Sequence, residues 1–190
     1  RIKLQLELIT KVSEVKDIKE DVNSMQTLLG EYLEYSKNNK KIEKTKRIRL
    51  KYFLSGIISK SKKNFIDKNI KLICDSNLNI SAKKNSLYRV FSNILDNACK
   101  FGDKVLVDVI NNQKNIHIKV EDDGPGIPAN IKKKIFNPFF KIDSSRNLNY
   151  VGSGLGLSIA SEIVRQIGGR IEVEKSKLGG SCFHIIIPYS

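Results

Sequence analysis

The sequence predicts an α/β fold, a two-layer α/β sandwich in which helices cover one face of a mixed sheet. Strand-like and helical stretches alternate from about residue 47 to the end of the chain, which is the pattern of such a sandwich. Hydrophobic residues make up 40% of the 190 residues, enough to build a core. The chain has no apolar run of about 18 residues, so we expect no segment to cross a membrane.

The first part of the chain has a different pattern, which predicts a helical segment in front of the sandwich. Mostly apolar positions recur here every three or four residues and form a seam, as in a helix that pairs with another helix. The seam positions are Val15, Ile18, Val22, Met25, Leu29, Tyr32 and Ser36. Residues 1–9 alternate apolar and polar side chains, which by periodicity alone predicts a strand. Residues 37–51 are rich in Lys and Arg and predict a hinge, so we expect domains at 1–43 and 47–190.

The later part of the chain predicts a regular succession of strands and helices. We expect strands near 47–50, 70–74, 104–110, 115–121, 170–175 and 182–187, and helices over 52–65, 84–101, 129–135 and 154–167. The strands before and after Asn111-Asn112-Gln113 should form an antiparallel pair, because only this short polar turn separates them. The segment from about 137 to 151 is polar and predicts a long loop.

One candidate site lies at residues 120–127, Val-Glu-Asp-Asp-Gly-Pro-Gly-Ile, where a strand runs into a glycine-rich turn. The carboxylate of Asp122 can accept a hydrogen bond from the exocyclic amine of a flat base. Gly124 and Gly126 allow such a ligand to approach the backbone closely. An ordinary solvated turn is the alternative interpretation.

A second candidate site lies on the predicted helix that ends at Phe101. At about 100° per residue, its apolar side chains share one face, while Asn93, Asn97 and Lys100 share the other. An amide oxygen suits Mg²⁺, and a lysine one turn further can meet a phosphate. The alternative is an amphipathic helix with a solvated polar face.

A third stretch, Gly152-Ser153-Gly154-Leu155-Gly156-Leu157, precedes the last predicted helix. A glycine-rich entry leaves the N–H groups of the first helical turn free for phosphate. The spacing G-x-G-x-G and the lack of a directly preceding strand exclude a dinucleotide fingerprint. Taken alone, this stretch is an ordinary flexible helix entry.

In this order and spacing, the three stretches resemble the ATP-binding domain of sensor histidine kinases, within the wider family shared with gyrase, Hsp90 and MutL. The matching motifs are the asparagine box at Asn93–Phe101, the first glycine box at Asp122–Gly126, the phenylalanine box at Phe136–Phe139, the second glycine box at Gly152–Gly156 and a terminal Gly-Gly-x-x-Phe at Gly179–Phe183. The resemblance covers roughly residues 47–190, and the run from Glu121 to Gly169 is most similar to EnvZ-like members.

The resemblance implies a site for ATP and Mg²⁺ on the Bergerat-type sandwich of this family. It implies that Asp122 accepts the adenine amine and that Asn97 binds the metal ion, with Asn93 and Lys100 as further catalytic residues. The remaining implied ATP-binding residues are Phe101, Gly124, Gly126, Ile127, Phe139, Lys141, Arg146, Gly152, Gly154, Leu155, Gly156 and Leu157. The loop at 137–151 corresponds to the ATP lid. Lys141 stands where relatives usually carry Arg, which keeps the charge but loses the bidentate fork.

For residues 1–43, the resemblance implies the C-terminal part of a dimerisation hairpin, with residues 1–9 as the tail of its first helix. The phosphoacceptor histidine would then lie upstream of Arg1, in a longer protein. His117 and His184 lie in alternating strand patterns and lack the phosphoacceptor motif, so we expect them to be strand residues. The implied partners are a second copy of the chain and a response regulator receiver domain, and the implied location is the cytoplasmic part of a bacterial inner-membrane sensor.

Position 93 separates a kinase from an ATPase. Gyrase-like members carry a glutamate four residues before the metal-binding asparagine, as general base for water, whereas Asn93 cannot accept a proton. A kinase is therefore favoured over the alternatives, a regulatory ATPase or switch and a nucleotide-binding module without kinase activity. An anti-sigma relative that phosphorylates serine is disfavoured by the predicted hairpin helix.

The net charge of +14 and the three cysteines complete the predictions. The charge is spread along the chain without a groove-reading or base-stacking motif, so we expect no nucleic-acid partner. Cys74, Cys99 and Cys182 have no C-x-x-C spacing and lie in apolar or helical patterns. We expect buried, reduced thiols and a cytosolic setting.

Overall fold

The structure is a computed structural model that describes residues 43–75, 78–112, 114–142 and 153–189, together with Ile18, Val22, Asn23, Met25, Gln26 and Gly30. The chain divides into two compact units, Arg1–Ile42 and Glu43–Ser190. The described residues of the first unit are helical, and the predicted strand at 1–9 lies outside the described residues. In the described part of the chain, no helix is both long enough and apolar enough to cross a membrane.

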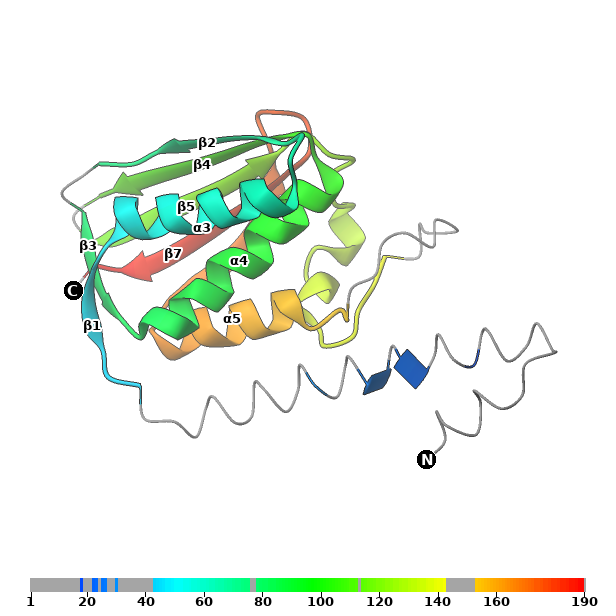
Figure 1. The fold of residues 1–190 in the computed structure, drawn as a ribbon, viewed down its shortest axis with the longest axis horizontal. Coiled ribbons are helices and arrows are strands. Elements are labelled where there is room, and N and C mark those ends of the chain that lie inside the picture. The colour runs from blue at the N-terminus through cyan, green and yellow to red at the C-terminus, as the bar shows by residue number, and fades with distance from the viewer. Residues whose placement is uncertain are drawn as a thin grey trace. The chain divides into compact units, whose positions relative to one another are not determined.

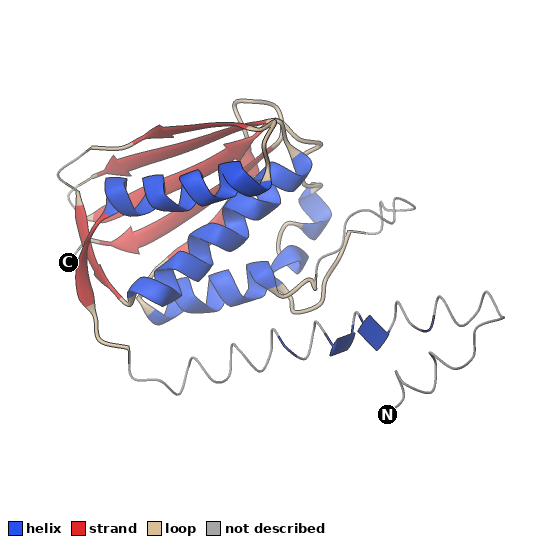
Figure 2. Cartoon of the chain, in the orientation of Figure 1, coloured by secondary structure: helices blue, strands red, loops and turns tan. Residues whose placement is uncertain are grey.

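The second unit is an α/β sandwich, as predicted. In chain order its elements are β1 (Lys46–Arg49), α3 (Leu50–Asn64), β2 (Asn69–Ile73), β3 (Asn79–Ala82), α4 (Lys84–Phe101), β4 (Lys104–Asn111), β5 (Asn115–Asp122), the 3₁₀ turns η1 (Ala129–Ile131) and η2 (Lys134–Phe136), α5 (Gly156–Gln166), β6 (Arg170–Lys175) and β7 (Ser181–Pro188). Helices α3, α4 and α5 lie together on one face of the sheet (Figures 1 and 2).

The main sheet has five strands in the order β2-β4-β5-β7-β6. β2 pairs with β4 in parallel, and the other neighbours are antiparallel, so the sheet is mixed as predicted. The order places β7, the last strand, between β5 and β6. The turn between β6 and β7 therefore comes next to the end of β5, where Asp122 lies.

The core lies between the helices and the sheet and follows from the two periodicities. On α4 the apolar residues recur at helical spacing and are buried; they are Leu87, Val90, Phe91, Ile94, Leu95 and Ala98. Alternate residues of the central strands face them; these are Ile116, Ile118 and Val120 of β5 and Phe183, Ile185 and Ile187 of β7. The other residues of β5 point to the opposite face of the sheet, which none of the described helices of the second unit covers (Figure 2).

The structure differs from the predictions in three points about the elements and in one about the cysteines. Strand β3 was not predicted, because only Ile80 among its four residues is strongly apolar; it pairs with β1 in a separate two-stranded sheet. The predicted helix at 129–135 is the pair of 3₁₀ turns η1 and η2, which start after Pro128. α5 begins at Gly156 rather than at 154, because Gly154 has a left-handed φ of 73°.

The fourth difference concerns the cysteines. All three are free thiols, and Cys99 and Cys182 are buried, but Cys74 is only partly buried because it follows the edge strand β2. Burial is the main cause that raises the pKa of Cys99 to about 11 and that of Cys182 to about 12. These two thiols therefore stay protonated at neutral pH.

Candidate functional site

Asp122 lies at the end of β5 and is 2% exposed. Its Oδ1 accepts hydrogen bonds from the backbone N–H groups of Gly124, at 2.9 Å, and of Ser181, at 3.0 Å. Its Oδ2 accepts no hydrogen bond from any described residue. Burial raises the pKa of the Asp122 carboxyl, and the two N–H donors partly oppose this shift. One carboxylate oxygen is thus held by the protein, while the other is left for a ligand.

The glycines around Asp122 leave no room for side chains. A Cβ atom at Gly124 would lie 2.6 Å from the carbonyl oxygen of Phe101, and a Cβ atom at Gly180 would overlap Asp122 Oδ1. Gly180 also donates its N–H to the backbone oxygen of Asp122, at 3.1 Å. The first glycine box, the end of α4 and the β6–β7 turn are therefore in direct backbone contact.

The polar face of α4 carries Asn93, Asn97 and Lys100, which lie one turn apart, as predicted. Asn93 donates a hydrogen bond from Nδ2 to the carbonyl oxygen of Gly156, at 2.9 Å. Asn97 is half-buried and makes no hydrogen bond with any described residue, so its amide oxygen is available to a metal ion. At the end of this helix, Phe101 is 51% exposed.

The phenylalanine box and the second glycine box are in contact. The N–H of Phe139 donates to the carbonyl oxygen of Gly154, at 3.0 Å. Gly154 has a left-handed φ of 73°, and an added Cβ atom would lie 2.8 Å from the carbonyl carbon of Phe139. Phe139 itself has a φ of 64°, which is uncommon for a residue with a side chain. These contacts join the start of the predicted lid to the second glycine box.

The start of α5 faces the polar side of α4. No side chain caps this helix, so the N–H groups of its first turn keep their capacity to bind an anion. A Cβ atom at Gly156 would lie 3.3 Å from Asn93 Cγ, which makes the close approach of the two helices depend on this glycine. The start of α5 and the polar face of α4, which the sequence predicts to bind phosphate and metal, therefore face each other.

The other predicted site residues are only partly placed. Arg146 and Gly152 lie outside the described residues, and Lys141 is exposed without an ion pair to any described residue. Ile127 and Leu157 are half-buried against the core, and Leu155 is buried. A separate hollow, lined by Arg47, Asn79, Ile80, Ser81 and Tyr189, contains none of the predicted site residues.

Three residues that hold the site together were missed in the sequence. Gly180 and Ser181 were placed in the terminal Gly-Gly-x-x-Phe motif before the last strand but not among the site residues, because nothing in their spacing indicates that both contact Asp122. Glu121 was passed over although it is buried, at 3% exposed. The available signal was an acidic residue directly before Asp122 at a position that alternation places on the opposite face of the strand.

Comparisons with known proteins agree with this geometry. The virulence sensor histidine kinase PhoQ of Salmonella typhimurium is 34% identical over 136 residues, which cover 70% of this chain and 27% of PhoQ. The mycobacterial sensor histidine kinase MprB has a TM-score of 0.68 at 23% identity, covering 76% of this chain and 97% of the solved chain. Full-length ShkA in complex with AMPPNP has a TM-score of 0.70 at 22% identity, and the match covers 100% of this chain and 42% of the ShkA chain.

The chain spans about a quarter of the length of the curated relatives that it matches. Residues 82–190, more than half of the chain, match the family of histidine kinase-, DNA gyrase B-, and HSP90-like ATPases. The matched range contains α4, the end of β5, the start of α5 and the β6–β7 turn, which are the parts of the site described above. The chain therefore belongs to this family, and it carries a catalytic ATP-binding domain of the sensor histidine kinase type.

Proposed function

We propose that this chain is the catalytic region of a two-component sensor histidine kinase, which transfers the γ-phosphoryl group of ATP to a histidine on a helical hairpin. The observation that carries the proposal is the carboxylate of Asp122, with Oδ1 held by two backbone N–H groups and Oδ2 without a partner among the described residues. A buried, oriented acceptor beside bare glycine backbone suits the exocyclic amine of adenine.

Mg²⁺ fits the donor set on α4. The amide oxygen of Asn97 is a hard ligand with no hydrogen bond to any described residue, and phosphate oxygens and water would complete the coordination. When bound, the ion neutralises charge on the phosphates. Lys100 lies one turn further on the same helix and supplies a cation on the same side. The N–H groups at the start of α5 would bind phosphate oxygens from the other side.

Transfer to a protein side chain is favoured over hydrolysis because of Asn93. Its amide donates to the carbonyl oxygen of Gly156 at the start of α5. A side-chain amide is not a base at neutral pH, so Asn93 cannot take a proton from water. With an amide in place of a general base at position 93, the site can position the γ-phosphoryl group until a histidine reaches it. Positioning and charge compensation supply most of the catalysis in such transfers.

We further propose that residues 1–43 are the C-terminal part of a dimerisation hairpin. Ile18 and Met25, two of the predicted seam residues, are helical and exposed, at 46% and 68%. Exposed apolar residues at seam spacing suit a paired helix from a second copy of the chain. We also propose, from the resemblance to sensor histidine kinases, that the chain is the cytoplasmic part of a membrane sensor.

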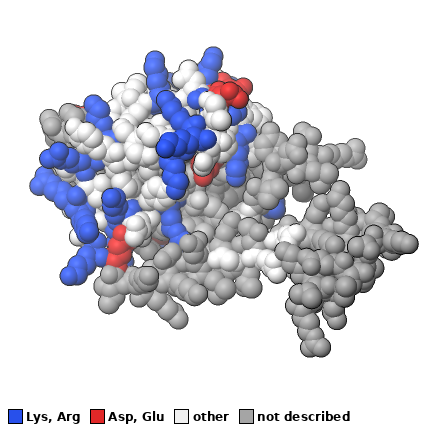
Figure 3. Space-filling view, in the orientation of Figure 1, with Lys and Arg blue, Asp and Glu red and all other residues white. Residues whose placement is uncertain are grey.

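A response regulator receiver domain is the proposed acceptor of the phosphoryl group from the hairpin histidine. Helix α3 presents exposed lysines, Lys51, Lys60, Lys62 and Lys63. Figure 3 shows Lys and Arg side chains spread over this face of the described part, with few acidic ones among them. A basic surface attracts an acidic partner and increases the association rate at low salt.

The test follows the γ-phosphate of labelled Mg·ATP when the chain is mixed with a separately supplied hairpin that carries the phosphoacceptor histidine. Acid-labile label on that hairpin with little free phosphate supports the kinase. Free phosphate that accumulates without labelled protein would instead show an ATPase and would contradict the argument from Asn93. Absence of any ATP binding would mean a nucleotide-binding fold with a degenerate pocket.

A further inference from the structure

We infer that Glu121 is a positioning residue for the nucleotide base: from the face of the sheet opposite the helices, it fixes the β6–β7 turn. Gly180 of this turn and Ser181, the first residue of β7, hold Asp122. The inference rests on the proposed ATP site at Asp122. Glu121 does not reach that site, because consecutive residues of a strand point to opposite faces. It acts through the turn.

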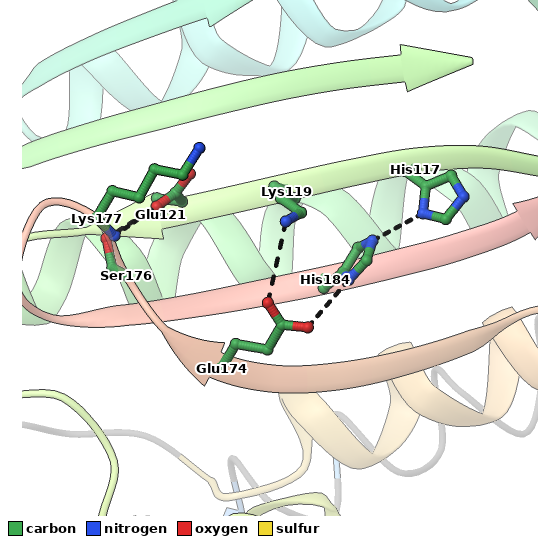
Figure 4. A network of polar contacts seen from close by, with 7 residues as sticks. All are labelled: His117, Lys119, Glu121, Glu174, Ser176, Lys177 and His184. Carbon is green, nitrogen blue, oxygen red and sulfur yellow. Dashed lines mark hydrogen bonds and ion pairs between the residues drawn. The ribbon is translucent and has the colours of Figure 1, made fainter. Parts of the chain in front are cut away.

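The carboxylate of Glu121 is buried, at 3% exposed, and its donors come from the turn. Oε2 accepts hydrogen bonds from the backbone N–H of Lys177, at 2.8 Å, and from the hydroxyl of Ser176, at 3.2 Å (Figure 4). Hydrogen bonds to an ionised group are about twice as strong as neutral ones, and a buried carboxylate without partners is unstable. Glu121 therefore favours the one turn conformation that supplies both donors.

The turn is closed by its own hydrogen bonds, which link its two ends. Ser176 donates its N–H to the carbonyl oxygen of Gly180, at 3.0 Å, and Gly179 donates its N–H to that of Ser176, at 3.2 Å. The hydroxyl of Ser176 also accepts the N–H of Leu178, at 2.9 Å. A constraint on Ser176 and Lys177 at one end is therefore passed to Gly180 at the other.

At its far end the turn contacts Asp122. Gly180 donates to the backbone oxygen of Asp122, at 3.1 Å, and Ser181 donates to its Oδ1, at 3.0 Å. A Cβ atom at Gly126 would lie 3.5 Å from the carbonyl oxygen of Gly180, so the same turn also borders the first glycine box. Glu121 and Asp122, adjacent in the chain, thus hold one turn from the two faces of the sheet.

The predicted effect is specific to the base. If the turn loosens, Asp122 loses one of the two donors that orient its carboxylate, whereas Asn97, Lys100 and the start of α5 keep their positions. Glu121→Ala should therefore weaken the binding of Mg·ATP about ten- to hundredfold, the range expected for lost charged hydrogen bonds. Binding of magnesium tripolyphosphate, which has no base, should change less than about threefold.

The experiment measures both affinities by calorimetry on the full chain and its variants. Glu121→Gln keeps one acceptor oxygen for the turn and should stay close to the wild type. Glu174→Ala is the matched control, because Glu174 lies on the same face, where it contacts His184 and Lys119 but not the turn (Figure 4). Ser176→Ala removes one donor to Glu121 and should give a smaller loss, which serves as the test if Glu121→Ala does not fold.

Amide exchange of Ser181, followed by NMR without nucleotide, separates this inference from the proposed function. Faster exchange at Ser181 in Glu121→Ala, together with the selective loss of ATP affinity, supports the inference. Unchanged Ser181 exchange, or equal losses for ATP and tripolyphosphate, overturns it. If the wild type binds no ATP while Ser181 exchange still rises in the variant, the proposed function fails and the contact between Glu121 and the turn stands.

Discussion

The side-chain amide of Asn93 donates a hydrogen bond of 2.9 Å to the carbonyl oxygen of Gly156. The two residues are 63 positions apart in the chain, and the bond joins the middle of α4 to the first residue of α5. Both helices contribute to the candidate site, α4 through its polar face and α5 through its uncapped first turn. Their relative position therefore depends on this contact and on the absence of a side chain at Gly156.

Replacing Asn93 with Asp tests this contact. A carboxylate cannot donate to the carbonyl oxygen of Gly156 and would face it with like charge. We expect the free energy of unfolding to fall by about 1–2 kcal/mol, measured by urea denaturation, and ATP affinity to fall as well. Ser92→Ala is the control, since its hydroxyl bonds only within α4, to the carbonyl oxygen of Arg89. Equal losses in both variants would show that the contact between the helices contributes little.

Asn97→Ala should abolish measurable Mg·ATP binding, because it removes the proposed amide ligand of the metal ion. Isothermal titration calorimetry with and without Mg²⁺ is the measurement. Asn85→Ala, at the exposed start of the same helix, should leave affinity unchanged. If Asn97→Ala binds Mg·ATP with wild-type affinity, the proposed metal-binding role of Asn97 is wrong.

Gly180→Ala and Gly56→Ala should change stability in opposite directions. A Cβ atom at Gly180 would overlap Asp122 Oδ1 and approach the N–H of Gly124 to 2.5 Å, so the turn would have to move away from Asp122. We expect a loss of about 1–3 kcal/mol, as for an overpacked site. Gly56 lies inside α3 with nothing within 4 Å of an added Cβ atom.

Gly56→Ala should therefore stabilise the protein by about 0.5–1 kcal/mol, because alanine loses less backbone entropy in a helix. Thermal and urea denaturation of both variants give the two values. A neutral Gly180→Ala that binds ATP normally would contradict the close contact between the turn and Asp122.

His117 should make stability depend on pH below about 6.5. Asn112 Oδ1 accepts the N–H of Asn115, at 2.8 Å, so its Nδ2 faces His117 Nε2, at 2.9 Å. His117 then carries its proton on Nδ1, which lies 2.9 Å from His184 Nε2, and the arrangement suits a neutral His117 ring (Figure 4). Burial is the first cause that lowers the pKa of His117, followed by His184 and two nearby cations, Arg170 and Lys119; Glu172 opposes them.

Because the pKa of His117 is lowered in the folded state, the unfolded chain binds more protons as the pH falls through 6.5. The stabilisation is present above that pH and is lost as the pH falls through the folded-state pKa. Urea unfolding at about pH 7.5 and about pH 5 should show this loss in the wild type and a smaller one in His117→Gln. An equal pH dependence in both proteins would exclude His117 as the cause.

Local patterns were sufficient for the elements that carry the motifs. Helix α4 spans Lys84–Phe101, as its apolar spacing predicts, and the antiparallel pair β4–β5 follows from alternation around a polar turn. Both depend on residues within one element or one hairpin, which a sequence displays directly. The polar face of α4 and the turn after Asp122 were predicted for the same reason.

The assembly of the site depends on contacts between distant segments. Ser181 lies 59 positions from Asp122, and Lys177 lies 56 positions from Glu121, yet the place of β7 between β5 and β6 makes each pair neighbours. No local periodicity encodes that strand order. The burial of Glu121 follows from the strand order, because it brings the β6–β7 turn to the end of β5. The amino-acid pattern was thus enough to select candidate groups for nucleotide binding. The order of the strands brought Ser181 to Asp122 and oriented its carboxylate, because hydrogen bonds in a sheet form between strands that are far apart in the chain.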